Sequence, residues 1–419
     1  MPNATSPVTT VLAGMASVLD WQEDYYRDLH SHPELSHQEH RTAAGVTERL
    51  RHCDFEVHER VGGTGVVGVL RNGQGPVVLL RADMDALPVL EATDLSYAST
   101  RTASDASGAE QPVMHACGHD MHVTCLLGAA QLLASGAAHW HGTLITLFQP
   151  AEEVGDGARG MVDGGLGELI PTPDVVLGQH VLPAPSGYVA TNAGPTMAAA
   201  DSVRITLHGR GSHGSMPQSA IDPVVLAAMI VVRLQTIVAR ENTPGEPAVL
   251  TVGSIQAGTK SNIIPAHAVL QLNLRSYSEH ARSRMLDAIR RIVAAECDAS
   301  GCPQPPEFEL FDNFPVTDND AAATERVASA FISHFGDRAG ALGQIMASED
   351  FSDIPTALGC PYTYWGFGGT DPRLYQAAAE AKRIAEDIPV NHSTHFAPVL
   401  QPTLATGTEA LVVAALAWL

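Results

Sequence analysis

The chain has little basic charge and few aromatic residues and cysteines. Its 419 residues include 24 Lys and Arg against 46 Asp and Glu, a formal net charge of −22. Without a basic surplus to neutralise phosphates, we expect neither a nucleic-acid nor an anionic-membrane partner. Six cysteines are too sparse for a disulfide framework. Cys297 and Cys302 could pair, but scattered free thiols fit the pattern better and predict a reducing cytoplasm.

Long hydrophobic runs and targeting signals are also missing. No run of about 18 apolar residues occurs, so we expect no transmembrane helix. The best candidate, residues 224–232, ends at Arg233. The N-terminus has no basic stretch followed by an apolar one, so we expect no signal peptide. The chain has 45% hydrophobic and 17% charged residues, a composition typical of globular proteins. Its length of 419 residues predicts two domains.

Helical patterns alternate with short apolar runs in the first part of the chain. The expected helices are 21–50, with a break near Pro33, and 123–133, and the expected strands are 66–70, 77–80, 144–148 and 175–177. This alternation predicts an α/β fold with a mostly parallel sheet covered by helices on both faces. Ligands of such sheets bind beyond the carboxyl ends of the strands. Polar side chains follow three of the runs, so we expect them to converge at one sheet edge; they are Asp83, Asp85, Glu152, Glu153 and His180.

A second unit begins after the Pro-, Gly- and Ala-rich stretch 183–200. The expected order is strand 202–208, helix 223–239, strands 249–255 and 268–274, helix 279–296 and strand 305–314. This β-α-β-β-α-β order is typical of a ferredoxin-like α+β domain. Helix and short strand return from Asp320 on, so the second unit interrupts the first. The expected boundaries are 1–196 and 313–419 for the two parts of the first domain, and 197–312 for the inserted one.

The segment Met114–Asp120 is the most informative stretch of the chain. It places Cys117 and His119 two residues apart, with further His and Asp side chains beside them. A thiol and an imidazole at this spacing suit a transition-metal ion. A buried cysteine beside a core histidine is the alternative, but this many polar groups could not all be buried without partners. The segment therefore predicts a metal site.

Remote segments carry further donors. Glu152 and Glu153 could form a solvated turn, or one could bind metal while its neighbour acts as a general base. A lone histidine such as His180 is a core residue about as often as a ligand, and a place just past a strand end favours the ligand. Either His392 or His395 could add a ligand from near the C-terminus.

Other polar residues have more than one interpretation. Asp83 and Asp85 could cap a helix, pair with Arg81, or hold the outer N–H of a histidine ligand. Four histidines lie ahead of the expected sheet, and we interpret most of them as surface or support; they are His30, His32, His37 and His40.

The second unit contains candidate substrate contacts. The Gly-rich loop 209–215 displays His213 but lacks the Lys-Ser/Thr ending of a phosphate-binding loop. Asn262 and Arg275 are suitable donors to a carboxylate or an oxyanion.

Taken together, these residues resemble the M20 metallopeptidase and amidohydrolase family, in its branch of hippurate hydrolases, auxin-conjugate amidohydrolases and N-acyl amino acid deacylases. The matching segments span nearly the whole chain and are 29–35, 81–88, 115–120, 149–153, 211–214, 262–265 and 392–393. The resemblance implies hydrolysis of the amide in an N-acyl amino acid, with a dipeptidase or carboxypeptidase-type metallopeptidase as the alternative. It also implies two divalent ions per subunit (Mn²⁺ or Zn²⁺, with Ni²⁺ and Co²⁺ as alternatives). The inserted domain would be a lid that also forms a homodimer or homotetramer.

The resemblance assigns roles by motif position. It implies Glu152 as general base, and His392 rather than His395 as ligand because the branch places this ligand four residues before an aromatic residue, here Phe396. The metal ligands that it implies are Cys117, His119, Glu153, His180 and His392. The residues that it implies for gripping the substrate carboxylate or the tetrahedral oxyanion are His213, Asn262 and Arg275, and the lid histidine of this family can reach the neighbouring subunit's site.

Two other classes of protein stay open as rivals. In a cysteine-dependent hydrolase Cys117 would be the nucleophile and His119 its base, but side chains at i and i+2 rarely align for proton transfer, and no third orienting group is evident. A non-catalytic binder that kept the fold is the second rival. The presence of every candidate ligand together with Glu152 disfavours it.

Overall fold

The computed structural model describes residues 6–105 and 107–419 and separates the chain into two compact units. Unit 1 contains the chain up to Gly194, Asp318–Gly343 and Asp350–Leu419, and unit 2 contains Pro195–Thr317 and Gln344–Glu349. Unit 2 is therefore an insertion in sequence order. The boundaries 1–196, 197–312 and 313–419 for folding domains stay a prediction.

Unit 1 is built on an eight-stranded sheet with the order β1-β2-β6-β3-β7-β18-β8-β17. Its strands are β1 (Glu56–Val61), β2 (Gly65–Asn72), β3 (Val77–Asp83), β6 (Gly142–Gln149), β7 (Val175–Pro185), β8 (Val189–Thr191), β17 (Ala339–Ala341) and β18 (Tyr362–Thr370). The four central strands β6, β3, β7 and β18 run parallel, which confirms the predicted mostly parallel sheet. The pairs β1–β2, β2–β6 and β8–β18 are antiparallel, a detail that the apolar runs did not indicate.

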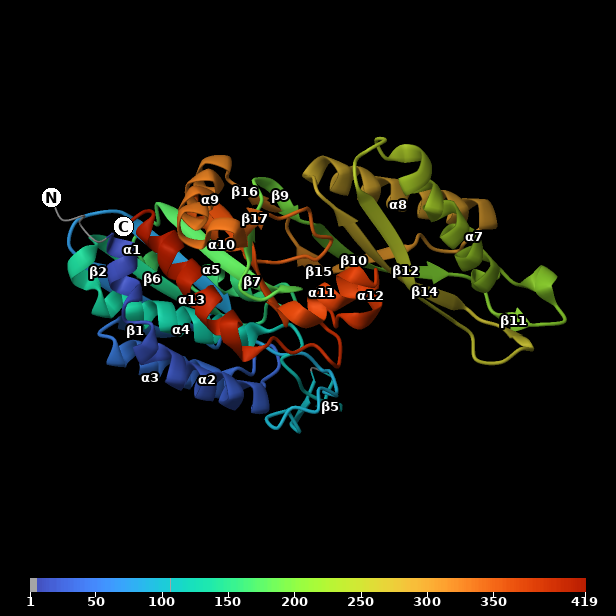
Figure 1. Ribbon diagram of the computed structural model, residues 1–419. Helices are drawn as coiled ribbons and strands as arrows, with labels where there is room; N and C mark the ends of the chain where they lie inside the picture. The colour runs from blue at the N-terminus through green and yellow to red at the C-terminus, as the bar shows by residue number, and fades with distance from the viewer. Residues whose placement is uncertain (1–5, 106) are drawn as a thin grey trace. The chain divides into compact units, whose positions relative to one another are not determined.

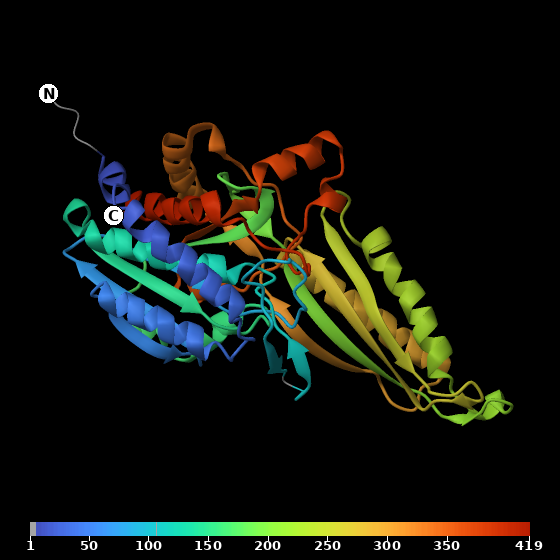
Figure 2. The same ribbon diagram turned by 60° about the horizontal axis from the view of Figure 1, so that its bottom comes forward.

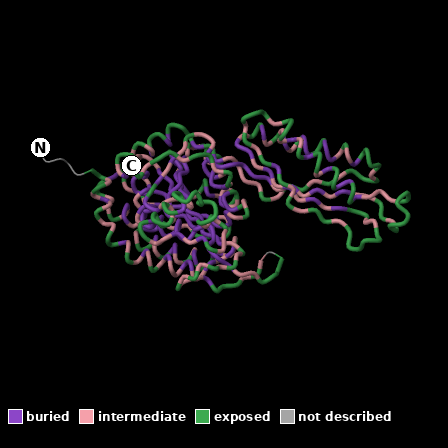
Figure 3. Tube along the Cα trace, turned by 45° about the vertical axis from the view of Figure 1, so that its right-hand side comes forward, coloured by how far each residue is buried: buried purple, intermediate pink, exposed green. Residues whose placement is uncertain are grey.

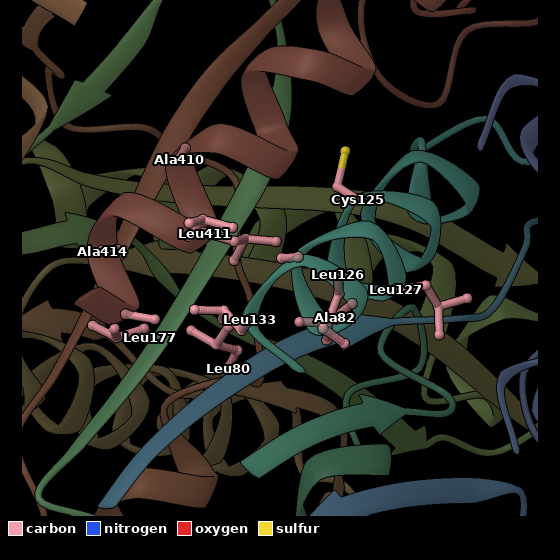
Figure 4. Close-up of a cluster of buried hydrophobic side chains, with 14 of the residues drawn as sticks. Leu80, Ala82, Cys125, Leu126, Leu127, Leu133, Leu177, Ala410, Leu411 and Ala414 are labelled. Atoms are coloured by element: carbon pink, nitrogen blue, oxygen red, sulfur yellow. The ribbon is translucent and has the colours of Figure 1, made fainter. Parts of the chain in front are cut away.

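Helices pack against this sheet and bury its central strands. The long helix α4 (His119–Ser135) is buried along most of its length beneath α2 (Ala16–Ser31) and α13 (Leu400–Leu416). Leu80 and Ala82 of β3 and Leu177 of β7 point toward α4 and α13 (Figure 4). Since a parallel central strand is covered on both faces, β3 is buried at almost every position rather than at alternate ones.

The remaining elements of unit 1 are shorter or lie at its periphery (Figures 1 and 2). The helix α3 lies beside α4, and α9 packs on α13. The bounds are α1 (Pro7–Leu12), α3 (His40–His52), β4 (Thr102–Ser104), β5 (Glu110–Pro112), η1 (Ala137–His139), α5 (Gly157–Asp163), α6 (Leu166–Leu169), α9 (Ala321–Phe335), η4 (Gly336–Arg338), α10 (Asp353–Leu358), α11 (Pro372–Glu380) and α12 (Ile384–Asp387). Two further short strands span the boundaries between the two units in sequence, namely β9 (Gly194–Met197) and β16 (Thr317–Asn319).

Unit 2 has a four-stranded antiparallel sheet in the order β12-β14-β10-β15. Its elements follow the chain as β10 (Ala199–His208), β11 (Ser212–His213), η2 (Pro217–Ser219), α7 (Pro223–Thr236), the π-helical turn η3 (Ile237–Glu241), β12 (Ala248–Ala257), β13 (Ile263–Ile264), β14 (His267–Ser276), α8 (Glu279–Ser300) and β15 (Glu307–Phe314). Burial alternates along β10 and β14 because only one face of this sheet is covered. Figure 3 shows that buried residues are most continuous inside the unit that carries both chain ends, which is unit 1.

One helix in the described part of the chain, Pro223–Glu241, is long and apolar enough to cross a membrane by length and composition alone. One side of it packs into the core of unit 2 through Leu226, Ile230 and Leu234. Val225, Met229 and Val232 are exposed on the other side. This one-sided burial is typical of a surface helix of a globular unit.

Candidate metal centre

Polar side chains from five segments of unit 1 gather near the carboxyl ends of the central strands. Asp83 closes β3 and Asp85 follows it, while Glu152 and Glu153 lie in the turn after β6. The turn before α4 contributes Cys117, and His119 is the first residue of α4. His180 lies on β7, and His392 lies in the loop before α13. These segments are remote in sequence, so the sheet topology brings them together.

The candidate ligand atoms form overlapping groups, and within each group the atoms lie within 4.8 Å of one another. One group joins the Cys117 thiol to His119 and His180. A second joins Cys117 to Glu153 and His392. Because Cys117 belongs to both, its sulfur lies where two cations could share it. The structure therefore brings together all five ligands that the family resemblance implied.

His395, the alternative to His392, belongs to none of these groups among the described residues. It is exposed, and its Nδ1 lies 2.9 Å from the Thr394 hydroxyl. The His392 backbone N–H donates to the carbonyl of Ala116, and Asn391 donates to the carbonyl of Cys117. These contacts hold the loop of His392 against the cysteine segment.

Gly118 lets the chain turn into α4 directly after the cysteine. Its φ is +86°, and a Cβ atom built there would lie 2.5 Å from Cγ1 of Val181. Burial, followed by the charges of Glu153 and Glu152, raises the pKa of the Cys117 thiol well above its usual value. The thiol therefore needs a neighbouring cation to ionise and act as a ligand.

His119 is oriented by a carboxylate behind it. Its Nδ1 lies 3.1 Å from Oδ1 of Asp85, whose other oxygen accepts from the Ser36 hydroxyl and the Glu153 backbone N–H. Its Nε2 is buried and has no hydrogen-bond partner among the described residues. Burial lowers the pKa of His119, but the carboxylates of Asp83 and Asp85 outweigh burial and raise it to about 10. Asp85 thus lies where it can take the outer N–H of the candidate ligand His119, one of the roles considered from the sequence.

His180 presents its Nε2 to the cysteine, 3.5 Å from Sγ of Cys117, while its Nδ1 donates to the carbonyl of Val181 at 2.8 Å. Burial, reinforced by the neighbouring His122, holds the pKa of His180 well below its usual value, which leaves a neutral imidazole suited to bind metal. The prediction that His180 lies just past a strand end is wrong. β7 continues to Pro185, because this stretch also pairs with β18, with His180 opposite Gly366.

Asp83 and His122 support the site from behind. Nδ1 of His122 donates to Asp83 at 2.5 Å, and its Nε2 accepts from the Val181 backbone N–H. Both ring nitrogens of His122 are occupied, so it has none left for a metal ion. Asp83 also accepts from Arg81, the pairing considered from the sequence.

The turn after β6 carries the two glutamates in a tight, strained conformation. Ala151 in this turn has a φ of +51°, which is unusual for a residue with a side chain. His392, in the loop before α13, also has a positive φ, of +69°. Oε2 of Glu153 lies 3.3 Å from Nε2 of His392, while its Oε1 is buried without a hydrogen-bond partner. Only 6% of the Glu152 side chain is exposed, so this carboxylate is not part of a solvated turn.

The types of donor atom at this site indicate whether divalent cations fit it. In the part of the chain that the structure describes, Nε2 of His119 and Oε1 of Glu153 are buried polar atoms without hydrogen-bond partners, and such atoms are costly unless something binds them. Thiolate, imidazole and carboxylate donors together suit borderline cations such as Zn²⁺. The residues present therefore fit a pair of divalent metal ions.

Unit 2 holds the candidate substrate contacts. β11 pairs with β13, which places His213 opposite Ile263 and next to the segment of Asn262. Both side chains are exposed, and Nδ1 of His213 accepts from the backbone N–H and hydroxyl of Ser215. Arg275 lies at the other end of β14, where it donates to the Met346 carbonyl and the Ser348 hydroxyl. The structure thus groups His213 with Asn262 but not with Arg275.

Residues of the segment 30–39 support the site in ways that their sequence pattern did not reveal. His30 is fully buried, and its Nδ1 lies 2.6 Å from Asp120, the residue after a candidate ligand. Ser36 donates to Asp85, and Glu39 accepts from the backbone N–H of Ala151. Only the resemblance over 29–35 could have drawn attention to this segment.

Comparisons with known proteins agree with this geometry. The model of peptidase family M20/M25/M40 matches residues 79–396. Thermostable carboxypeptidase 2 of Saccharolobus solfataricus is 41% identical over 74% of this chain and 76% of its own length. A hippurate hydrolase of Campylobacter jejuni is 37% identical over 83% of this chain and 89% of its own. A solved structure of a dinuclear metal binding peptidase of the M20 family from Bacillus subtilis superposes with a TM-score of 0.75 at 27% identity, covering 96% and 99% of the two chains.

The matched region contains all five candidate ligands and Glu152, so the family match and the geometry concern the same residues. The chain belongs to peptidase family M20/M25/M40.

Proposed function

We propose that this hydrolase is a metal-dependent amidohydrolase that cleaves the amide bond of N-acyl amino acids or related amino acid conjugates. The observation that carries the proposal is the Cys117 thiol shared by two groups of metal donors, with the buried carboxylate of Glu152 beside them. Such a site suits hydrolysis of an amide by an activated water.

The substrate class rests on relatives and on the chemistry of unit 2. The similarity to a hippurate hydrolase favours an N-acyl amino acid, because hippurate is one. The similarity to a carboxypeptidase keeps a dipeptidase or carboxypeptidase-type activity as the second candidate. Both substrate types carry a free carboxylate, for which either Asn262 or Arg275, which lie at opposite ends of β14, is a suitable donor.

The ligand groups suggest how two ions would be held. Cys117, His119 and His180 would hold one ion, and Cys117, Glu153 and His392 the other. Mn²⁺ and Zn²⁺ are the preferred ions, with Ni²⁺ and Co²⁺ as alternatives. When bound, the two cations polarise the scissile carbonyl and lower the pKa of a water molecule.

The chain's own residues move the protons and orient the donors. Glu152 takes a proton from the attacking water and delivers it to the leaving nitrogen. Asp85 and the Val181 carbonyl keep the rings of His119 and His180 in orientation, since each takes the outer N–H of its histidine. His213 donates to the oxyanion that develops during attack.

The inserted unit would be a ferredoxin-like lid and dimerisation domain. Its β-α-β-β-α-β order and its strand order β12-β14-β10-β15 support this description. β12 is an edge strand, and α7 exposes Val225, Met229 and Val232 along one side. An edge strand beside an apolar helix face is suited to a second copy of the chain, so we favour a homodimer over a homotetramer.

A reducing cytoplasm is the compartment that we favour. All six cysteines are free in the structure, and Cys117 could serve as a ligand only as a reduced thiolate.

Chelation followed by a substrate panel tests the proposal. The enzyme is dialysed against a chelator, and then Mn²⁺ or Zn²⁺ is added back. Acetyl, benzoyl and indole-acetyl conjugates are compared with dipeptides of the same amino acids, with metal content measured on each sample. We expect activity to vanish, to return with metal, and to favour the conjugates.

Each rival predicts a different result from this panel. A cysteine nucleophile would keep its activity without metal. A non-catalytic binder would bind the conjugate and release no product. A carboxypeptidase-type enzyme would prefer the peptides.

A further inference from the structure

Glu39 is a buried carboxylate that the proposed mechanism does not use. It immediately precedes α3, but its side chain makes no capping hydrogen bond to that helix. The residue is fully buried, and it lies in a segment whose histidines the sequence indicates as surface or support. A buried carboxylate is costly unless hydrogen bonds compensate it, so its partners indicate what holds it there.

Three donors converge on this carboxylate from three parts of unit 1. Oε1 accepts from the backbone N–H of Ala151 and that of His37, each at 2.9 Å. Oε2 accepts from the Thr64 hydroxyl at 2.5 Å. Hydrogen bonds to an ionised carboxylate are stronger than neutral ones, so these contacts fix the position of Ala151.

Ala151 is a demanding position in the turn after β6. Its φ of +51° lies in the left-handed region, which residues with a Cβ atom rarely adopt without support from their surroundings. Its carbonyl accepts from the Gly157 backbone N–H, and its own N–H is the one held by Glu39. Glu152, the proposed proton carrier, is the next residue.

The backbone on the other side of Glu152 is held in the same way. The N–H of Glu153 donates to Oδ2 of Asp85 at 3.0 Å. Two buried carboxylates therefore each hold one backbone N–H, immediately before and immediately after Glu152. The Asp85 contact belongs to the orientation of the metal ligands, whereas the Glu39 contact belongs to the turn alone.

We propose that Glu39 is a positioning residue for Glu152, because its carboxylate holds Ala151 in the left-handed conformation from which Glu152 reaches the reacting atoms. This inference rests on the proposed function, in which Glu152 carries the proton. The hydrogen bonds of Glu39 go to His37, Thr64 and Ala151, and none of these described partners is a candidate metal ligand.

The test compares four variants with the wild type, all with bound metal. In Glu39→Ala the turn can relax, so we expect kcat to fall by about 10²-fold, the scale expected for a small misplacement of a reacting group. We expect both metal ions to be retained, and KM to change less than about threefold because ground-state binding is not altered.

Glycine at position 151 distinguishes a positioning role of Glu39 from a purely structural one, because only a positioning role predicts that this glycine restores kcat. Glycine adopts a positive φ without strain, so Ala151→Gly should replace part of what Glu39 provides. We expect the double variant Glu39→Ala/Ala151→Gly to recover kcat by roughly tenfold over Glu39→Ala, with Ala151→Gly alone as its baseline. No recovery would overturn the inference, as would a kcat of Glu39→Ala within about twofold of the wild type.

Glu34 offers a matched control on the same segment. Its carboxylate also takes three hydrogen bonds, from the Arg41 and Thr42 backbone N–H groups and the Thr42 hydroxyl, but none from the turn after β6. Glu34→Gln should lose stability and keep its kcat. An equal loss of kcat in this variant would show that any damage near α3 is sufficient, and would overturn the inference.

Two further provisions keep the result decisive. If Glu39→Ala does not fold, Glu39→Gln with and without Ala151→Gly replaces it, with a smaller loss and the same recovery expected. Failure of the proposed function would show in the wild type, as no hydrolysis of N-acyl amino acids, or in Glu152→Gln, as unchanged turnover. Failure of the present inference would show only in the Glu39 variants.

Discussion

The metal centre of unit 1 and the β11–β13 pair of unit 2 prepare their histidines in opposite ways. His119 and His180 are buried, and each has one ring nitrogen occupied by a fixed acceptor, Asp85 or the Val181 carbonyl. His213 is exposed, and its Nδ1 accepts from the neighbouring Ser215. Unit 1 therefore holds these two rings through buried partners, whereas unit 2 holds the ring of His213 through a neighbour in an exposed turn.

This difference in burial matches the two proposed roles, which are metal binding in unit 1 and substrate binding in unit 2. A metal ligand must be held in place before the ion arrives, and buried outer partners provide that. A substrate donor can be left exposed if it is needed only when substrate is present. The following predictions test this contrast, beginning with the largest expected effect.

Glu152→Gln should cause the largest loss, because it removes the proton carrier and leaves the ligands intact. We expect kcat to fall by roughly 10²–10⁴-fold with metal content unchanged. The exposed residue Glu168 on α6 provides a matched control, and Glu168→Gln should behave like the wild type. Turnover close to that of the wild type in Glu152→Gln would show that another group carries the proton.

His213→Gln tests the exposed member of the comparison. If His213 donates to the oxyanion, kcat should fall by about 10²–10³-fold while metal content and the free energy of unfolding stay unchanged. His267, also exposed in unit 2, is the control, as His267→Gln should have no effect. Full activity of His213→Gln would show that His213 does not donate to the oxyanion.

Asp85→Asn tests whether outer partners matter for the buried histidines. The asparagine amide lacks the negative charge with which Asp85 holds the N–H of the His119 ring. Metal affinity should therefore fall by about 10–100-fold. Competition with a chelator of known affinity measures the change. Unaltered affinity would show that the Asp85 contact does not orient the ligand.

His30 gives the smallest effect and a distinct pH dependence. Burial lowers its pKa, but Asp120, with Glu91, raises it from 6.5 to about 9. The rings of Tyr26 and Tyr97 also pack against it. A histidine whose pKa is raised by folding stabilises the fold below its unfolded pKa and loses that contribution as the pH rises.

The stability difference between the wild type and His30→Gln should therefore be fully present below pH 6.5 and decline as the pH rises through about 9. Urea unfolding of both proteins across this range measures it. A difference that stays constant, or one that grows toward pH 9, would contradict a charged His30.

Much of the fold follows from local patterns. Continuous apolar runs predicted β3, β6 and β7, because central parallel strands are buried on both faces. The antiparallel pairing of β2 with β6 was missed, since an apolar run carries no information about strand direction. β7 was predicted too short, because the apolar run is interrupted by Gly178, Gln179 and His180 although the strand continues to pair with β18 as far as Pro185.

The site was predictable in its residue types and less so in its geometry. Spacing alone pointed to Cys117 and His119, and strand ends pointed to the carboxylates. No local pattern could place His392 beside Glu153, because backbone bonds from its loop to Ala116 and Cys117 bring it there. The buried roles of His30 and Glu39 depend on partners far away in sequence, so composition and periodicity do not reveal them.

The most direct test of this account is an anomalous-scattering map of crystals grown with Mn²⁺. The account predicts two peaks per chain on either side of the Cys117 sulfur, one near His119 and His180 and the other near Glu153 and His392. A map without a peak among these five side chains would contradict it.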